Sequence, residues 1–183
     1  MAIYKRFFSN EYKYVFFTIV TYNRMPILID NIELLRSSFK YAMEKFKFEI
    51  YSAVILDDHM HILLKLENTN NYPEIIRLIK YYFSIHIGGH ANALPTLQLS
   101  DSKIKKREKG VWQRRYWEHT IRDENDFYRH LDYIHYNPIK HGFTQKAIDY
   151  PYSSFEKFVG LGYYNEDWCN FEDKNNISKL NYE

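Results

Sequence analysis

The chain has 183 residues, of which 45% are hydrophobic, 19% are aromatic and one is cysteine, and its formal net charge at pH 7 is +2. This length fits one domain with a sizeable core, and a single cysteine excludes an internal disulfide framework and suits a reducing compartment. No apolar run reaches membrane-spanning length, and no apolar segment follows the first basic residues as a signal peptide would require. We therefore expect a soluble, cytoplasmic protein without a membrane partner, in which nucleic-acid binding would need a local basic patch.

The first half of the chain predicts a strand, a helix and a two-stranded hairpin. Residues 14–22 are β-branched or aromatic almost throughout, which predicts a strand. Apolar residues at helical spacing over 31–47 predict a helix, with Asp30 as its N-cap. Two mostly apolar segments, 48–56 and 59–66, then predict strands joined by a tight turn.

The second half predicts two helices around a fourth strand. A proline at its first turn and apolar residues at helical spacing predict a helix over 73–87. A strand is expected over 116–121. Asp123 then caps a helix over 124–137, which Pro138 is expected to end.

The order strand, helix, strand, strand, helix, strand and final helix is the split-βαβ pattern of a ferredoxin-like fold. We therefore expect an α+β domain with one largely antiparallel sheet, helices on one face, and an additional helix over 124–137. This domain is expected to occupy residues 1–142. Residues 143–183 carry many aromatic and few aliphatic side chains, which predicts a C-terminal extension that wraps the domain and is loose at its end.

Two histidines flank one residue at the start of the third strand. His59 and His61 follow the acidic turn Asp57-Asp58, and because strand side chains alternate faces, both point to the same face of the sheet. Two imidazoles on one rigid strand can form half of a divalent-metal site. The pair is equally compatible with an ordinary polar strand face, and the only cysteine lies far away in the sequence, so the pair alone leaves both interpretations open.

The final helix carries a polar stripe beside its apolar one. His130, Tyr133 and Asn137 are spaced i, i+3 and i+7, and Tyr133 and Asn137 lie one above the other. An amide oxygen is an acceptable ligand for Mg²⁺ or Mn²⁺, and a phenol is a competent nucleophile. Alternatively, Tyr133 is one of many core tyrosines and Asn137 only ends the helix. Tyr128 and Tyr136 compete on the same helix, but neither stacks on Asn137.

Basic and aromatic residues alternate shortly before the fourth strand. Residues 103–109 are rich in lysine and arginine, which is usual for a solvated linker. They lead into Trp112–Trp117, where basic and aromatic side chains interleave, and this combination favours a surface that follows a nucleic-acid backbone and stacks on bases. The candidates for holding a strand are Lys105, Lys106, Arg107, Arg114, Arg115 and Trp117, with Tyr4, Lys5 and Arg6 from an N-terminal arm.

These motifs together are similar to those of known enzymes. His59-Met60-His61, followed by an apolar run, resembles the His-hydrophobic-His signature of the HUH endonuclease superfamily. The segments Trp112–His119 and Asp132–Gly142 resemble the single-tyrosine transposases, and among them the branch called REP-associated tyrosine transposases. The resemblance covers most of the chain, from Tyr14 to about Phe158, and its most specific part is Tyr133–Gly142.

The resemblance implies a ferredoxin-like enzyme that nicks and joins single-stranded DNA near hairpins, as a monomer or homodimer and without a nucleotide cofactor. It implies Tyr133 as the nucleophile, which forms a 5′-phosphotyrosine link, and His59, His61 and Asn137 as ligands of Mg²⁺ or Mn²⁺. A free phenol has a pKa of about 10, so the tyrosine needs help in losing its proton. Possible helpers are His119 and His130, and the sequence does not choose between them.

Two other functions fit part of this pattern. A non-catalytic ferredoxin-like module that binds RNA or single-stranded DNA would explain the aromatic residues and the fold. It gives no reason for His59, His61, Tyr133 and Asn137 to coincide. A metal-dependent hydrolase that activates water would not need Tyr133, so a 5′-phosphotyrosine link would separate both alternatives from a transposase.

Overall fold

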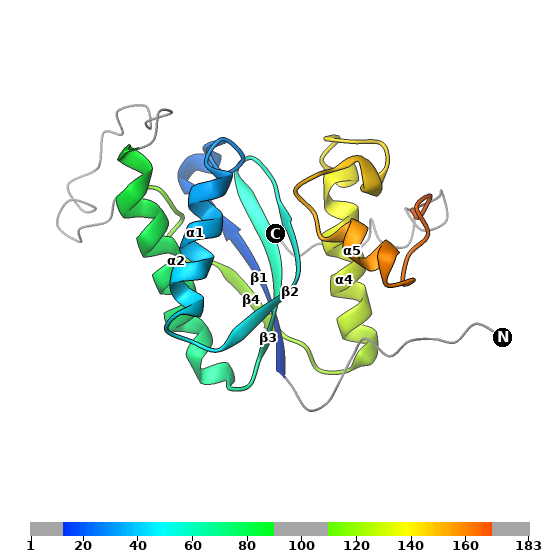
Figure 1. Cartoon of the computed structure of the whole chain (residues 1–183), viewed down its shortest axis with the longest axis horizontal. Coiled ribbons are helices and arrows are strands. Elements are labelled where there is room, and N and C mark those ends of the chain that lie inside the picture. The colour runs from blue at the N-terminus through cyan, green and yellow to red at the C-terminus, as the bar shows by residue number, and fades with distance from the viewer. Residues whose placement is uncertain (1–12, 90–109, 170–183) are drawn as a thin grey trace.

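A computed structural model of the chain describes residues 13–89 and 110–169 (Figure 1). The strands are β1 (Lys13–Val20), β2 (Phe48–Ile55), β3 (His59–Leu66) and β4 (Trp117–Thr120). The α-helices are α1 (Ile32–Met43), α2 (Tyr72–His86), α4 (Glu124–Lys140) and α5 (Phe155–Gly160). None of these helices is both long and apolar enough to cross a membrane, as judged over the described ranges.

The four strands form one antiparallel sheet in the order β2-β3-β1-β4. β1 pairs along its whole length with β3, from Lys13 opposite Leu66 to Val20 opposite His59. The acidic turn between β2 and β3 is closed by the N–H of Leu56, which donates to the carbonyl of His59 at 2.8 Å. This strand order and these directions confirm the predicted ferredoxin-like α+β fold.

Helices cover both faces of the sheet: α1 and α2 lie on one face, and α4 and α5 on the other (Figure 1). Alternation along β1 supplies both cores, because Phe17 and Ile19 join the α1 and α2 core whereas Tyr14 and Phe16 join the α4 core. Phe127 of α4 packs on Tyr14 with ring centroids 4.9 Å apart. The expected additional helix is therefore α4, and α5 was not predicted.

The two helix starts differ in how they are capped. The N-cap of α1 is Asn31, so the prediction of Asp30 is wrong. The Asn31 side chain donates to the carbonyl of Ile27 at 2.8 Å, which closes the preceding turn, while its own carbonyl begins the helical ladder. The predicted cap of α4 is confirmed, since the Asp123 side chain accepts from the N–H of Asp126 at 2.8 Å.

Pro138 does not end α4, and the prediction that it would is wrong. The helix continues to Lys140, and the N–H of His141 donates to the carbonyl of Asn137 at 3.0 Å. A proline lacks an N–H but keeps its carbonyl, and the Pro138 carbonyl accepts from the N–H of Phe143 at 2.9 Å. Because Pro138 is buried in the last turn of the helix, packing outweighs the single lost hydrogen bond.

The described part of the C-terminal segment adds to the free edge of β2. The N–H of Ile55 donates to the carbonyl of Tyr152, and the N–H of Ser154 donates to the carbonyl of Ala53, both at 2.9 Å. The α5 helix that follows buries Phe155 against the α4 core. Residues 151–169 therefore pair with the β2 edge and also pack against α4.

A buried polar network fastens this segment to α4. The His135 ring, which is fully buried, contacts the Ser154 hydroxyl through Nε2 at 2.9 Å and the Tyr164 hydroxyl through Nδ1 at 3.1 Å. The Tyr164 hydroxyl also donates to the Asp132 carboxylate at 2.6 Å. Ser52 of β2 joins through its hydroxyl, 3.2 Å from His135 Nε2. Three segments of the chain therefore meet at one histidine, on the flank of α4 that lies next to β2.

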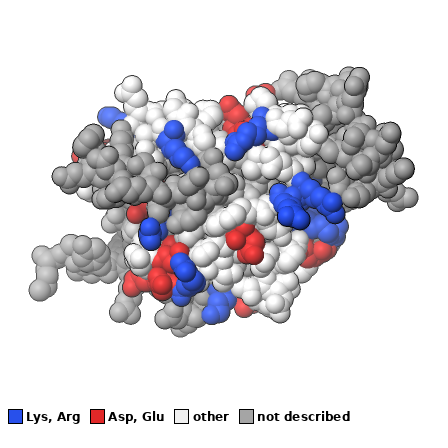
Figure 2. Space-filling view, turned by 180° about the vertical axis from the view of Figure 1, so that it is seen from behind, with Lys and Arg blue, Asp and Glu red and all other residues white. Residues whose placement is uncertain are grey.

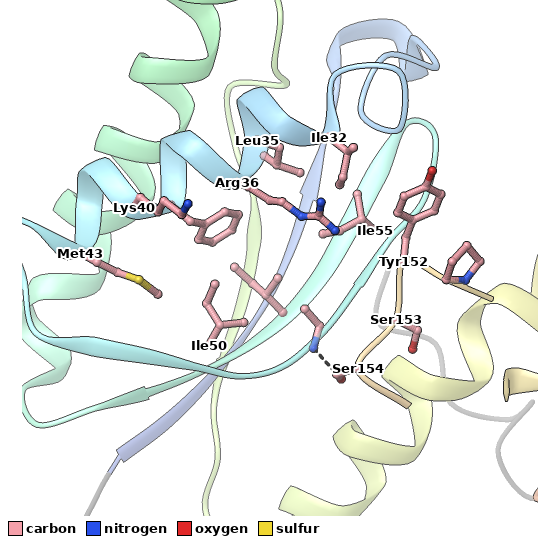
Figure 3. A pocket seen from close by; sticks show the side chains of 14 residues that line it. Ile32, Leu35, Arg36, Lys40, Met43, Ile50, Ile55, Tyr152, Ser153 and Ser154 are labelled. Carbon is pink, nitrogen blue, oxygen red and sulfur yellow. Dashed lines mark hydrogen bonds between the residues drawn. The ribbon is translucent and has the colours of Figure 1, made fainter. Parts of the chain in front are cut away.

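An apolar groove of about 430 Å³ lies between α1 and β2 (Figure 3). Its floor includes Ile50, Ile55 and Ile62 from the sheet, and Pro151–Ser154 forms one side. Ile62 and His61 are neighbours on β3, so their side chains point to opposite faces of the sheet. The groove is thus separate from the polar site described below.

Replacing Tyr164 with Phe is expected to lower the free energy of unfolding by about 1–3 kcal/mol, because it leaves buried partners without the hydroxyl that they contact. Equilibrium unfolding in urea measures this. The matched control is Tyr81→Phe, whose ring is 50% exposed on α2, and which should change stability by no more than about 0.5 kcal/mol. Equal losses of stability in Tyr164→Phe and Tyr81→Phe would show that the His135 network does not stabilise the fold.

Acid should destabilise the fold partly through His135. Burial lowers the pKa of this imidazole from 6.5 to about 3. Between these two values the unfolded chain binds a proton that the folded chain does not, so the free energy of unfolding falls as the pH drops below 6.5. From pH 7 to pH 5, His135→Gln should lose up to about 2 kcal/mol less stability than the wild type. Urea titrations at the two pH values measure the loss of stability. Identical losses for the wild type and His135→Gln would exclude His135 as an origin of the acid sensitivity.

Candidate active site

Two histidine rings lie side by side on the face of the sheet that α4 covers. His59 and His61 form an edge-to-face pair with ring centroids 5.0 Å apart, and both side chains are buried, at 1% and 0% exposure. Their burial follows from the central position of β3, which has β1 on one side and β2 on the other. The alternation of strand side chains therefore places both imidazoles in the interior.

Each ring is held through its Nδ1 atom. His59 Nδ1 lies 2.5 Å from Asp58 Oδ1, and Arg24 donates to the other Asp58 oxygen at 3.1 Å. His61 Nδ1 lies 2.8 Å from Thr18 Oγ1, on the residue directly opposite in β1. A partner on Nδ1 fixes the ring, so any cation would be bound through Nε2.

The charge states suit this arrangement. Although burial raises the pKa of the Asp58 carboxyl, hydrogen bonds from His59 and Arg24 outweigh it and hold that pKa below its ordinary value. Burial lowers the pKa of His61 well below its ordinary value, and the charges of His59, Lys140 and other cations nearby act in the same direction. His61 is therefore neutral at pH 7, which is the form that binds metals.

The α4 helix brings three side chains to this pair. Tyr133 lies edge-to-face against His61 with ring centroids 5.1 Å apart. The ring of His141, just after the helix, lies edge-to-face against His59 with ring centroids 5.0 Å apart. Residues 133, 137 and 141 are spaced four apart and share one stripe of the helix. Asn137 is therefore positioned between these two contacts and faces the histidines.

The site contains buried polar atoms that the described residues leave without a hydrogen-bond partner. They include His61 Nε2 and both side-chain atoms of Asn137, Oδ1 and Nδ2. Native interiors seldom leave such atoms unsatisfied, and exceptions often mark a site for an ion or ligand. Imidazole nitrogens together with an amide oxygen form a donor set for a divalent cation, so the residues fit a metal site of the kind that the sequence predicts.

The sequence of the chain is similar to those of known proteins. A family model described as "Transposase IS200 like" matches residues 8–137 of the chain. The REP-associated tyrosine transposase of Escherichia coli is 31% identical over 170 residues, which cover 92% of this chain and 92% of that protein. A Haemophilus influenzae protein named for the same transposases is 42% identical over 170 residues, covering 92% of this chain and 93% of that protein. The chain belongs to the REP-associated tyrosine transposase family.

A solved structure of a member of this transposase family, bound to a REP hairpin, has a similar fold. The TM-score is 0.74 at 29% sequence identity, and the match covers 100% of this chain and 96% of that one. The resemblance to REP-associated tyrosine transposases that the motifs indicate is thus confirmed for the family and the fold.

Lys140 adds a positive charge at the tyrosine. Its Nζ atom donates to the Tyr133 hydroxyl at 3.3 Å and lies 5.1 Å from the centroid of the Tyr133 ring. Lys140 is half-buried, whereas Tyr133 is fully buried. Lys140 was not predicted as a site residue, because the helix was expected to end at Pro138. Its position seven residues after Tyr133, on the same stripe of a longer helix, was the signal that could have found it.

The two proposed proton acceptors belong to a separate group, the Asp126 cluster (His119, Arg122, Asp126 and His130). His119 Nε2 donates to the Asp126 carboxylate at 2.7 Å, and Arg122 donates to the same oxygen at 3.1 Å. His130 Nδ1 donates to the Asp126 carbonyl at 2.8 Å, and its ring stacks on His119 with centroids 4.7 Å apart. This cluster joins β4 to the first turn of α4.

The pKa values of the Asp126 cluster suit a structural contact between β4 and α4. Although burial raises the pKa of Asp126, hydrogen bonds from Arg122 and His119 outweigh it and lower that pKa to about 2. Burial lowers the pKa of His130 to about 4. Potential ligand atoms of His119, Asp126 and His130 lie within 4.8 Å of one another, so this is a second group of metal-ligand type. A cation there would compete with the Arg122 guanidinium for the carboxylate.

The predicted DNA-binding residues are only partly described. Arg114, Arg115 and Trp117 are exposed, and Trp117 stacks nearly parallel to His119 with ring centroids 5.8 Å apart. On the face shown in Figure 2, coloured Lys and Arg side chains lie in several separate groups, some beside Asp or Glu. The remaining candidates lie outside the described residues: Tyr4, Lys5, Arg6, Lys105, Lys106 and Arg107.

The structure thus brings His59, His61 and Tyr133 into contact and aligns Asn137 with them. Sequence reasoning missed the partners that orient the rings. Asp58 directly precedes His59, so its proximity was readable from the sequence. The contact of Thr18 with His61 could not be read from the sequence, because it depends on the pairing register of β1 and β3.

Proposed function

We propose that the chain nicks and joins single-stranded DNA beside hairpins through a covalent 5′-phosphotyrosine link on Tyr133. The observation that carries this proposal is the Tyr133 ring packed on His61, with Asn137 and its unpartnered amide on the same helical stripe. The proposed partner, hairpin DNA, is supported by the similar transposase whose structure is bound to a REP hairpin. The names of the similar proteins include a tyrosine, and Tyr133 lies in the segment Asp132–Gly142 that resembles the motif of these transposases.

The proposed reaction exchanges one phosphodiester for another. Tyr133 Oη attacks the scissile phosphorus, the Oη–P bond forms, and the bond from phosphorus to the 3′ oxygen breaks. The phenolic proton passes to water, and the departing 3′ oxygen gains a proton from water. Because the phosphotyrosine is itself a phosphodiester, a second 3′-hydroxyl can attack it and restore a DNA strand without a nucleotide cofactor.

The proposed cation site consists of His59, His61 and Asn137, which would hold Mg²⁺ or Mn²⁺. When bound, the cation would neutralise charge on the non-bridging phosphate oxygens. Asp58 and Thr18 hold the two rings through Nδ1, so that Nε2 of each is directed away from those partners. The cation-rich surroundings of His61, including Lys140 and Arg24, also favour an anionic phosphate at this place.

The proposed nucleophile is fully buried. A phosphate can therefore reach Tyr133 Oη only if side chains around it move when DNA binds. Trp117 and the neighbouring Arg115 are exposed near the β4 edge, where they can stack on a base and contact a phosphate. The proposed order is thus that DNA binds first and the phosphate then enters the site.

A non-catalytic single-stranded nucleic-acid-binding module is the alternative function. It would need the exposed Trp117 and the sheet but not a phenol buried against two histidines. Unsatisfied atoms of Asn137 would lower its stability without benefit. These observations favour the enzyme.

Tyr133→Phe should abolish covalent DNA–protein adducts, because only the attacking oxygen is removed. Incubation with labelled single-stranded hairpin DNA and Mn²⁺, followed by a denaturing gel, measures the adduct. Hairpin affinity should stay within about threefold, since most contacts to DNA lie elsewhere. Tyr128→Phe, on the same helix with its hydroxyl on Glu124, is the matched control and should form adducts normally. Adducts that persist in Tyr133→Phe would exclude this nucleophile.

Replacing both His59 and His61 with Ala should lower the rate of Mn²⁺-dependent cleavage by at least about 100-fold and weaken Mn²⁺ binding by a similar factor. Calorimetric titration with Mn²⁺ provides a measurement that does not depend on activity. The control is His86→Ala, on α2 at the other face of the sheet. Wild-type cleavage and Mn²⁺ affinity in the double variant would show that the cation site is elsewhere, with the Asp126 cluster as the next place to examine.

A further inference from the structure

The Tyr133 oxygen has a cationic neighbour that comes from its own helix. Lys140 Nζ donates to this oxygen at 3.3 Å and lies 5.1 Å from the ring centroid, so the ammonium sits over the edge of the ring that carries the hydroxyl. Both residues belong to α4, and Lys140 lies on the part of the helix that continues past Pro138. The rigid helix therefore fixes the distance between the two side-chain origins.

The placement of Lys140 is unusual for a lysine that serves only solubility. A lysine normally extends its charged end into water. Lys140 is half-buried and directs its ammonium towards a fully buried phenol, on the side of α4 where His61 and His141 also lie. An ammonium group has three N–H donors and no acceptor, so it binds an anionic oxygen more strongly than a neutral one.

We propose that Lys140 is a catalytic residue that stabilises negative charge on Tyr133 Oη during both DNA cleavage and DNA joining. This inference rests on the proposed phosphotyrosine mechanism and extends it by assigning a group to the nucleophilic oxygen. It differs from general-base catalysis, because the ammonium donates a hydrogen bond and removes no proton.

The two directions of the reaction place the same demand on this oxygen. In cleavage, the phenol gives its proton to water, the Oη–P bond forms and the bond to the 3′ oxygen breaks. In joining, a 3′-hydroxyl oxygen attacks the phosphorus, the Oη–P bond breaks with its electron pair returning to Oη, and the resulting phenolate takes a proton from water. Charge develops on Oη in both transition states, so one fixed cation lowers both barriers.

The test compares Lys140→Met, which keeps much of the side-chain length but removes the charge, with Lys140→Arg, which restores a cationic donor. Single-turnover adduct formation measures cleavage, and addition of a strand with a free 3′-hydroxyl to isolated adduct measures joining. We expect Lys140→Met to slow both steps by about 10- to 100-fold. Lys140→Arg should recover most of each rate, and the affinity for uncleaved hairpin should change much less than either rate.

Lys146→Met is the matched control, because it removes an exposed lysine shortly after α4 and should leave both rates unchanged. An unfolding midpoint close to the wild type checks that Lys140→Met is folded. Three results for Lys140→Met would overturn the role of Lys140: unchanged rates, slowing of cleavage alone, or a loss of hairpin affinity equal to the loss of rate. None of these results would contradict the phosphotyrosine mechanism. Absence of any adduct with the wild-type chain would instead overturn both proposals.

Discussion

The packing of α4 across the two central strands is the constraint on which the site depends. Phe127 packs on Tyr14 near the start of the helix, and the Tyr133 ring contacts both Phe16 and His61 further along. Because residues four apart share a helical stripe, this one orientation also aligns Asn137 with β3. A single docked helix thus assembles groups that are far apart in the sequence.

Holding α4 in that orientation has an energetic cost, and the surrounding structure offsets it. Each buried polar atom without a partner, such as those of Asn137, destabilises the fold by about 1–3 kcal/mol. The Asp126 cluster fastens the first turn of α4 to β4, and the His135 network fastens the flank of α4 next to β2 to residues 151–164. The stabilising contacts therefore lie at the start and on one flank of α4, whereas the unsatisfied polar atoms lie at the site. Such a distribution is expected where function opposes stability.

The sequence predicted this fold well where local pattern and tertiary packing agree. The bounds of β3 were predicted at both ends, because His59 to Leu66 follow a turn and form an almost continuous apolar strand. Prediction failed at Pro138, where the usual helix-breaking effect of proline is overridden by burial in the last turn. Because the helix was expected to end at Pro138, Lys140 was not predicted as a neighbour of Tyr133. The α5 helix was also missed, since six residues give too short a pattern for helical periodicity to be recognised.

For the site, helical spacing placed Tyr133 with Asn137, and the family motif proposed their roles. The most direct test of this account is to locate the covalent link by mass spectrometry. Adduct formed by the wild-type chain with hairpin DNA would be digested with nuclease and protease, and the peptides would be fragmented. A phosphotyrosine mechanism on Tyr133 predicts a nucleotide phosphate on Tyr133 and an unmodified Tyr136 in the same peptide. A link on Tyr136 or on any other residue would contradict it.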